Sequence, residues 1–183
     1  MKSTSNKTTP FTFWFTGLSA SGKTTLSERL YQDLKDLGLN NIILLDGDIF
    51  RDQIKNHNYD SFSRSEIHKK KLELASKLNS EGKIVLISGI SHKKETRRMA
   101  RLCIENYYEI FLSCNVQICA HRDFKNLYSR AFSGEINNFV GVNIEYEVDE
   151  DSADLTINTG EKSIEDCAQI ILDNVRKVLS LDF

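Results

Sequence analysis

The segment that most constrains the fold is Gly17–Thr25, which reads GLSASGKTT. Its first eight residues match the pattern G-x-x-x-x-G-K-[ST] at every fixed position. An apolar run precedes the segment and a run with helical spacing follows it, which is the context that this pattern requires. In such a loop the glycines let successive backbone N–H groups point at one phosphate, and the start of the helix adds its positive end. The pattern therefore predicts a phosphate-binding loop, or P-loop.

The residues of this loop have separate expected tasks. Lys23 is expected to reach the β- and γ-phosphates of ATP, and the Thr24 hydroxyl to bind Mg²⁺. ATP and Mg²⁺ are therefore the expected cofactors. The residues expected to bind ATP here are Gly17, Ser19, Ala20, Ser21, Gly22, Lys23, Thr24 and Thr25. The alternative, a glycine-containing turn with a chance lysine, is disfavoured because the full pattern and both flanks are present.

Apolar runs alternate with helical patterns along the rest of the chain. We expect strands at 11–16, 41–45, 83–88, 108–113 and 154–158, and helices at 24–37, 65–81, 94–105 and 163–179. This alternation predicts an α/β fold with a five-stranded, mostly parallel sheet and helices on both faces. Ligands bind beyond the carboxyl ends of such strands. The segments to inspect are therefore 17–25, 46–51, 88–92 and 114–142.

The composition is that of one globular domain. The chain has 183 residues, of which 40% are hydrophobic and 27% charged, enough for one domain with a sizeable core. Residues 1–10 are polar and predict a flexible N-terminal tail, which leaves a single domain at 11–183. The formal net charge of −2 disfavours a general nucleic-acid binder, because such proteins need a broad basic face.

The cysteines and the hydropathy pattern predict a cytoplasmic location. None of the four cysteines pairs with another at C-x-x-C spacing, so we expect reduced thiols in or near the core. The polar N-terminus lacks the apolar centre of a signal peptide. No apolar run approaches the length of a membrane-spanning helix, so no membrane association is expected.

Two carboxylates follow the expected second strand, in the sequence Leu45-Asp46-Gly47-Asp48. Beside a P-loop, one of them can hold a Mg²⁺-bound water and the other can accept a proton from an attacking hydroxyl. Arg51 then lies where it could bind an anion of the acceptor. The alternative interpretation of D-G-D is a turn and a helix cap, since aspartate is common in both.

With these motifs in place, the chain resembles the adenylylsulfate (APS) kinases. The loop compares with the family's G-L-S-G-S-G-K-[ST]-T, and segment 46–51 compares with D-G-D-N-V-R. Segment 89–97 compares with F-I-S-P-Y-R-x-D-R, and segment 122–141 with the long signature that ends in G-E-I-K-G-F-T-G. The resemblance runs from about Phe13 to the last helix. It implies a P-loop kinase of sulfate assimilation that phosphorylates the 3′-hydroxyl of adenosine 5′-phosphosulfate to give PAPS, and it suggests a homodimer.

The resemblance also implies a role for each matching residue. Asp48 becomes the base, which leaves Asp46 to bind Mg²⁺ together with Thr24. The catalytic residues implied are Lys23, Asp48 and Ser91. The family assigns a phosphoserine role to the serine at Ser91, whereas P-loop kinases normally transfer phosphate directly and in line. Arg122 would lie against the adenine of ATP, a stacking role that suits a guanidinium.

The acceptor-binding residues implied in the same way come from three segments and from a lid at about 122–142. They are Asp48, Arg51, Tyr59, Phe62, Arg64, Ile90, Ser91, Lys125, Asn138 and Phe139. Tyr59 and Phe62 compete for the family's base-stacking position. A structural explanation competes with ligand binding for some of these residues. Arg122, Lys125 and Arg130 could form a solvated basic surface, and Phe139 could be a core residue.

The departures from the family pattern lie on the acceptor side. The family's asparagines after D-G-D and in D-R-E-E-N are Ile49 and Ile67 here, and F-I-S-P is replaced by Gly89-Ile90-Ser91-His92. Losing a hydrogen-bonding group in a polar pocket usually costs affinity for the original ligand. An alternative acceptor is therefore a cytidine diphosphate that carries a phosphoramidate, as in bacterial capsule biosynthesis.

Two other classes of protein compete with this interpretation. A nucleoside kinase or shikimate-like kinase would not need Arg51, Arg64 and Lys125 together. A non-catalytic nucleotide-binding module is expected to lose Lys23, Thr24 or Asp48, and all three are present. A GTPase would need an N-K-x-D guanine signature, which the chain lacks.

Overall fold

The computed structural model describes residues 9–56, 58–148 and 153–181. Most of the tail expected at 1–10 lies outside these residues. Within them, the sheet has five strands: β1 (Thr12–Gly17), β2 (Ile42–Asp46), β3 (Ile84–Ser88), β4 (Tyr107–Ser113) and β5 (Leu155–Asn158). Their order is β2-β3-β1-β4-β5, and every pairing is parallel. The predicted α/β fold is confirmed, with a sheet that is parallel throughout its described strands.

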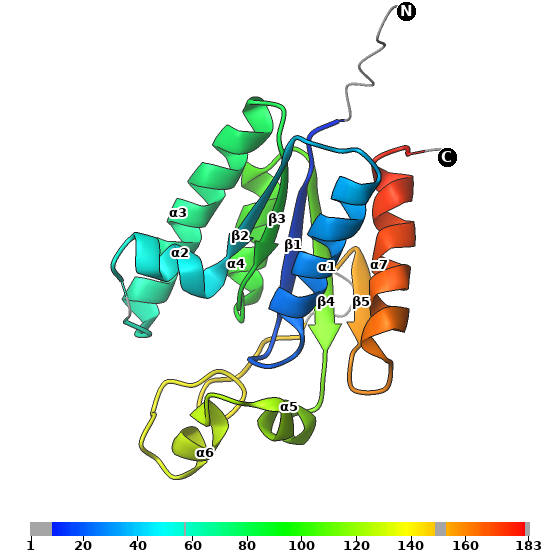
Figure 1. Cartoon of the computed structure of the whole chain (residues 1–183). Helices are drawn as coiled ribbons and strands as arrows, with labels where there is room; N and C mark the ends of the chain where they lie inside the picture. Colours follow the sequence, from blue (N-terminus) through cyan, green and yellow to red (C-terminus); the bar gives the residue numbers. More distant parts are fainter. Residues whose placement is uncertain (1–8, 57, 149–152, 182–183) are drawn as a thin grey trace, which may run out of the picture.

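Four long helices cover the two faces of the sheet (Figure 1). They are α1 (Lys23–Asp36) with α7 (Ile164–Val178), and α3 (Ser61–Ser80) with α4 (Lys94–Cys103). The alternation along β1 shows why both faces need cover. Phe13 and Phe15 pack with buried residues of α1 and α7, while Trp14 points the other way and packs with α3 and α4. A strand buried on both faces reads as a continuous apolar run, as this one does.

Three short helices were not expected from the sequence. They are α2 (Gly47–Gln53), α5 (Val116–Arg122) and α6 (Leu127–Phe132). All three follow strands β2 and β4 at the carboxyl end of the sheet, and α5 and α6 lie beyond the arrowhead of β4 in Figure 1. They therefore stand where an α/β sheet binds its ligands. In the part of the chain that the structure describes, no helix is long and apolar enough to cross a membrane.

A buried ion pair ties the segment after β3 to the core. Arg97 of α4 and Glu109 of β4 are each less than 5% exposed, and their Nε and Oε1 atoms are 3.3 Å apart. Arg97 also donates hydrogen bonds to the backbone carbonyls of Ser91 (2.6 Å) and Glu147 (2.5 Å). Burial raises the pKa of Glu109, and the charge of Arg97 opposes that shift. Either residue without the other would be an uncompensated buried charge, so the pair is expected to stay together. Arg97, fixed in this way, holds the loops that contain Ser91 and Glu147 in place.

Candidate active site

The P-loop has the backbone geometry that phosphate binding requires. Gly17 has φ of +143°, and a Cβ there would lie 2.5 Å from the carbonyl oxygen of Leu112 in β4. Gly22, with φ of +96°, is the last residue before α1, so the helix begins at Lys23. The free N–H groups of its first turn therefore face the loop. The loop thus presents a ready-made anion site at the carboxyl end of the central strand.

The Lys23 side chain folds back over the loop. Its ammonium donates a hydrogen bond to the carbonyl oxygen of Leu18 at 2.5 Å. Burial lowers the pKa of Lys23 to about 8, although the charges of Cys119, Asp48 and Asp46 oppose the shift. A phosphate beside the ammonium would favour its charged form. The ammonium thus lies at the P-loop, and its binding of phosphate oxygens stays a prediction.

Ala20 is the non-glycine residue of the P-loop that has a positive φ. It has φ of +56°, in the left-handed region that favours glycine. An alanine in this conformation costs roughly 1–2 kcal/mol of folding free energy. Replacing it with glycine removes this cost, but the greater freedom of glycine in the unfolded chain cancels about half of the gain. Ala20→Gly is expected to raise the free energy of unfolding by about 0.5–1 kcal/mol, as measured by urea denaturation. Ala120→Gly in α5 is the control and is expected to lower it by about 1 kcal/mol. Equal losses in both variants would contradict this account.

Asp46 is the centre of the candidate metal site. Its Oδ2 accepts hydrogen bonds from the hydroxyls of Thr24 (2.8 Å) and Ser88 (2.7 Å). Its Oδ1 accepts from the backbone N–H groups of Asp48 (2.9 Å) and Ile49 (3.3 Å), which caps α2. Burial raises the pKa of Asp46, but these hydrogen bonds outweigh it and hold the pKa below its ordinary value. The helix-cap interpretation is therefore confirmed, and it leaves the carboxylate ionised beside the P-loop.

The oxygens of Thr24 and Asp46 fit Mg²⁺. This ion is usually bound by one or two protein oxygens together with phosphate oxygens and water. Among the described residues, no group of three or more His, Cys, Asp or Glu side chains could hold a metal without a nucleotide. Ser88 was not among the predicted site residues, although it is the first residue of segment 88–92, which was expected at the ligand-binding end of the sheet. Its hydroxyl fixes the orientation of Asp46.

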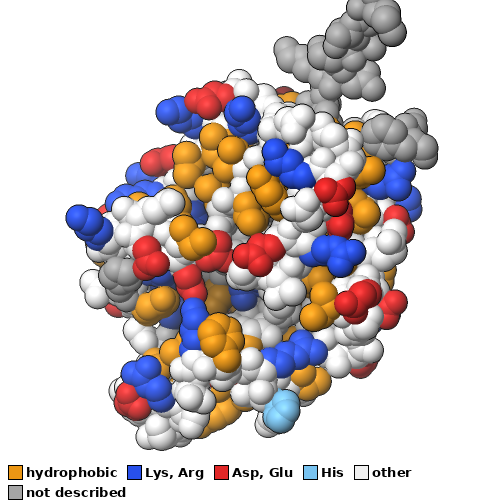
Figure 2. Space-filling view, in the orientation of Figure 1, with side chains coloured by type: hydrophobic (Ala, Val, Ile, Leu, Met, Phe, Trp, Pro, Cys, Tyr) orange, Lys and Arg blue, Asp and Glu red, His pale blue; other side chains and the backbone are white. Residues whose placement is uncertain are grey.

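Asp48 faces the lid. Its Oδ2 forms an ion pair with Nζ of Lys125 at 2.8 Å, and both side chains are largely exposed. Hydrogen bonding to Asp48 raises the pKa of Lys125. Figure 2 shows acidic and basic side chains next to each other where the lid meets the rest of the domain. The structure thus brings together two predicted residues that lie 77 positions apart in the sequence.

Two arginines flank Tyr59 on the same side of the site. The Arg51 guanidinium lies 4.2 Å from the centre of the Tyr59 ring and donates a hydrogen bond to the carbonyl of Asn58 at 2.7 Å. Arg64 donates to the carbonyls of Tyr59 (2.6 Å) and of Asn138 in the lid. Burial lowers the pKa of both arginines, which nevertheless stay charged because a guanidinium does not lose its proton in proteins. The predicted acceptor-binding arginines are therefore neighbours.

The lid contacts both the P-loop and the acceptor side. Tyr128, which is 1% exposed, donates a hydrogen bond from its hydroxyl to the carbonyl of Ser19 at 3.0 Å. Its ring meets that of Phe139 edge to face, with centroids 4.8 Å apart. Tyr128 belongs to the long signature at 122–141, but it was not among the predicted site residues. It joins the lid to the ATP loop, while Lys125 and Asn138 join it to the acceptor side.

The residue that follows β5 is tied to the P-loop. Arg122 donates a hydrogen bond to the carbonyl of Thr159 at 2.9 Å, and the Thr159 hydroxyl donates to the carbonyl of Ser21 at 3.0 Å. Arg122 is exposed, so its face is accessible to a base. Thr159 was also missed, because it is a lone threonine after a short strand with no motif around it. The stacking role of Arg122 stays a prediction.

The remaining predicted acceptor residues differ in exposure. Phe62 is 72% and Ile90 37% exposed, whereas Ser91 is only 3% exposed. The Ser91 hydroxyl has no hydrogen-bond partner among the described residues, and its backbone N–H donates to the Thr16 hydroxyl at 3.2 Å. A phosphorylated serine would need room that this packing does not offer. The assignment of Ser91 as a catalytic residue stays a prediction.

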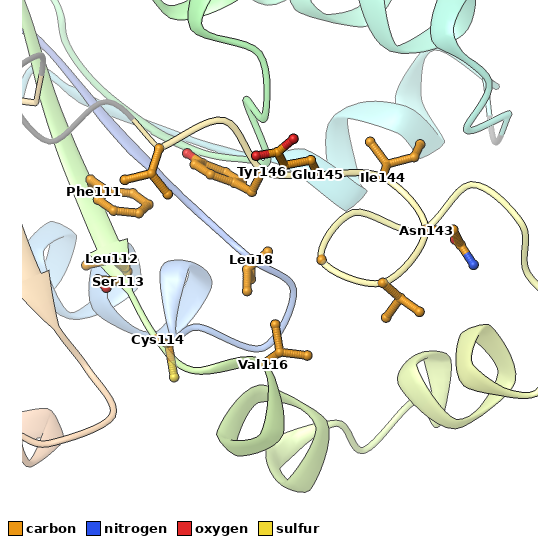
Figure 3. Close-up of a pocket in the computed structure, with 13 residues that line it drawn as sticks. Leu18, Phe111, Leu112, Ser113, Cys114, Val116, Asn143, Ile144, Glu145 and Tyr146 are labelled. Atoms are coloured by element: carbon orange, nitrogen blue, oxygen red, sulfur yellow. The ribbon is translucent and has the colours of Figure 1, made fainter.

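A cavity of about 410 Å³ lies on another side of the P-loop (Figure 3). It is lined by Leu18, residues 111–114 at the end of β4, Val116, and residues 141–146 and 148. Gly141 lies so close to Leu18 that an added Cβ would be 2.8 Å from a methyl group of that residue. None of the predicted site residues lines this cavity, so the candidate active site is the separate, charged surface described above.

Comparison with known proteins identifies related kinases. The family model described as adenylylsulphate kinase matches residues 9–158. The chain is 38% identical over 167 residues to the cytidine diphosphoramidate kinase of Campylobacter jejuni, a match that covers 91% of this chain and 96% of that protein. It is 37% identical over 166 residues to the adenylyl-sulfate kinase of Synechococcus sp. strain JA-3-3Ab, with coverage of 90% and 93%.

A solved structure shows the same fold. The Mycobacterium tuberculosis APS kinase CysC in complex with AMPPNP and APS superposes with a TM-score of 0.84 at 31% identity. The superposition covers 92% of this chain and 99% of that chain. The two chains therefore share one fold over nearly their whole length.

Proposed function

The chain belongs to the adenylylsulphate kinase family and is a phosphotransferase that acts on a hydroxyl group, and from this premise we propose its acceptor and mechanism. We propose that it transfers the γ-phosphate of ATP to the ribose 3′-hydroxyl of a nucleotide whose 5′-phosphate carries a second anionic group. The observation that carries the proposal is the position of Asp48. Its carboxylate is paired with Lys125 of the lid, on the side of the P-loop where Arg51 and Arg64 meet Tyr59.

In the proposed mechanism, the residues around the P-loop hold and neutralise the triphosphate. Backbone N–H groups of the loop and the Lys23 ammonium bind the β- and γ-phosphate oxygens. Thr24 and Asp46 would hold Mg²⁺, which would neutralise charge on those phosphates. The Asp48 carboxylate accepts the proton of the 3′-hydroxyl as its oxygen attacks the γ-phosphorus in line, and ADP leaves.

The acceptor side is proposed to hold the nucleotide by charge and by stacking. Arg51, Arg64 and Lys125 supply three cations for the 5′ anionic groups. Tyr59, which is 45% exposed, already carries one guanidinium on its ring and supports stacking of a base. Closure of the lid onto the P-loop through Tyr128 would exclude water, which protects ATP from hydrolysis.

Of the two candidate acceptors, we favour cytidine diphosphoramidate over adenosine 5′-phosphosulfate. The departures at Ile49, Ile67 and Gly89 all lie on the acceptor side, and a relative at 38% identity carries the name cytidine diphosphoramidate kinase. Ile49 is 57% exposed, so an asparagine there could reach a ligand, whereas Ile67 is 4% exposed and contributes to packing. The alternative, adenosine 5′-phosphosulfate, is supported by the adenylyl-sulfate kinases at nearly the same identity.

The test compares kcat/KM for cytidine diphosphoramidate, adenosine 5′-phosphosulfate and plain nucleotides under one set of conditions. We expect the first to be the best acceptor and adenosine 5′-phosphosulfate to be poor. Ile49→Asn should raise kcat/KM for adenosine 5′-phosphosulfate about fivefold, the effect of one added hydrogen bond of about 1 kcal/mol. The Ile49→Asn, Ile67→Asn double variant shows whether a second amide adds to this.

Stability measurements keep this comparison interpretable. A buried asparagine at position 67 without a partner would cost about 1–3 kcal/mol of folding stability. The Ile67→Asn single variant is therefore the control for a loss of folded protein. Fast turnover of adenosine 5′-phosphosulfate by the native enzyme, unimproved by either substitution, would overturn the proposed change of acceptor.

A further inference from the structure

Lys71 is a buried lysine on the acceptor side of the site. It lies in the middle of α3 and is 6% exposed. Its ammonium rests against the backbone at the carboxyl ends of β2 and β3. A Cβ added at Gly89 would be 2.8 Å from Nζ of Lys71, and a Cβ added at Gly47 would be 3.1 Å from it. Gly47 and Gly89 border Asp46 and Ser88, so this charge lies at the candidate metal and acceptor site.

The ammonium is poorly compensated by the protein. Among the described residues no hydrogen bond or ion pair of the Lys71 side chain is found, and its ammonium lies 5.7 Å from the centre of the Phe50 ring. Burial, together with the charges of the nearby Arg51 and Lys23, lowers the pKa of Lys71 to about 8, and the charges of Asp46 and Asp48 oppose the shift. A buried charge without a partner destabilises a fold. An uncharged side chain of the same length would suit the protein interior better.

Gly89 makes room for this charge. It stands where the F-I-S-P motif of the related kinases has phenylalanine. A side chain at position 89 would displace the ammonium from its present place, because even a Cβ would lie 2.8 Å from Nζ of Lys71. A large aromatic group of that motif is thus absent where this chain places a cation. Compared with that motif, this chain has a positive charge in place of an aromatic ring at the edge of the proposed acceptor site.

We propose that Lys71 is a specificity-determining residue, whose ammonium binds an anionic oxygen of the group attached to the acceptor's 5′-phosphate. This inference rests on the proposed function. The ligand chemistry is that of a nucleoside 5′-diphosphate or a diphosphate derivative, in which the outer phosphoryl group offers the oxygen. Arg51 and Arg64 then remain for the inner phosphate, and the buried position of Lys71 makes its contact selective for acceptors long enough to reach it.

The test uses Lys71→Met, which keeps an unbranched side chain one atom shorter and removes the charge, with Lys70→Met as the matched control, since Lys70 is exposed on the same helix. KM and kcat are measured for ATP, for cytidine diphosphoramidate, for adenosine 5′-phosphosulfate and for CMP. Lys71→Met should raise KM for the extended acceptors about 10- to 100-fold, the loss expected for one charge-assisted hydrogen bond. KM for ATP and for CMP should stay within about twofold, and Lys70→Met should change none of them.

A second measurement separates this role from a structural one. If Lys71 serves the ligand, Lys71→Met should unfold at the same temperature as the native protein or higher, because the uncompensated charge is gone. A lower unfolding temperature with an unchanged KM for the extended acceptors would overturn the inference. So would a rise in KM for ATP alone, because the lysine would then serve the triphosphate.

The kinetic and binding measurements together show which of the two proposals fails. If the native enzyme phosphorylates none of the acceptors, the proposed function fails. Calorimetric binding of the same nucleotides to the native protein and to Lys71→Met, with ADP and Mg²⁺ present, then still decides the role of Lys71. Equal affinities would overturn it, and a weaker affinity of the variant for the extended nucleotides alone would support it.

Discussion

Lys23→Ala is expected to remove nearly all turnover while the protein stays folded. Lys23 is the first residue of α1, and its ammonium lies over the P-loop, bonded to the carbonyl of Leu18. In that position it faces the phosphates that gain charge in the transition state. The loss of one preorganised donor costs typically ~3–4 kcal/mol, or about 10²–10³ in kcat. Steady-state kinetics with saturating ATP and the best acceptor measures this loss.

The control for this variant is Lys35→Ala, at the other end of the same helix. Lys35 lies near the ring of Tyr31 and away from the P-loop, so its removal should leave kcat unchanged. Circular dichroism and the unfolding temperature should show both variants folded. Near-normal activity of Lys23→Ala with any good acceptor would mean that the P-loop assignment is wrong.

Asp48→Asn is expected to lower kcat by roughly 10²–10⁴, the range for a positioned acid–base group. The amide cannot accept the proton of the attacking hydroxyl. The lost ion pair with Lys125 should cost little stability, because both side chains are largely exposed. KM for ATP should change little, since Asp46 and Thr24 remain in place to bind the metal.

Asp52→Asn, one turn further along α2, is the matched control for Asp48→Asn and should keep kcat within about twofold, in the range of ordinary surface substitutions. Titration of Mg²⁺ completes the test. If Asp48→Asn needs far more Mg²⁺ or loses ATP binding while kcat is kept, Asp48 belongs to the metal site and another group is the base.

The long elements could be predicted because each carries its own periodic signal. The helix α3 is an instructive partial case. It begins at Ser61, four residues before the expected start, because Asp60 caps it through a 2.9 Å hydrogen bond from the N–H of Ser63. The helix α2 was not expected, since its seven residues are too few to show helical spacing and the D-G-D sequence also suits a turn. Its cap, Asp46, doubles as a candidate metal ligand.

The ATP side of the site could be predicted from the sequence because its residues are contiguous. Ser88, Tyr128, Thr159 and Lys71 could not, because each acts through a contact with a distant segment. Lys71 stands in a run of three lysines, 69–71, that is typical of a solvated helix face. Only the packing of α3 against β2 and β3 turns the third of them inward. The pairing of Asp48 with Lys125 likewise depends on how the lid lies.

The strand order β2-β3-β1-β4-β5 puts β3 next to the strand that carries the P-loop, with β2 beyond it. The candidate metal ligand Asp46 ends β2 and Ser88 ends β3, and two departures from the family pattern, Ile49 and Gly89, follow within three residues of them. Phosphate activation and the choice of acceptor are therefore expected to share this edge of the sheet. A change of acceptor in a lineage of such kinases would then have to spare Asp46, Asp48 and Ser88 while their neighbours are exchanged. The replacements at positions 49 and 89, beside a D-G-D segment that is kept, have the distribution that such a history would leave.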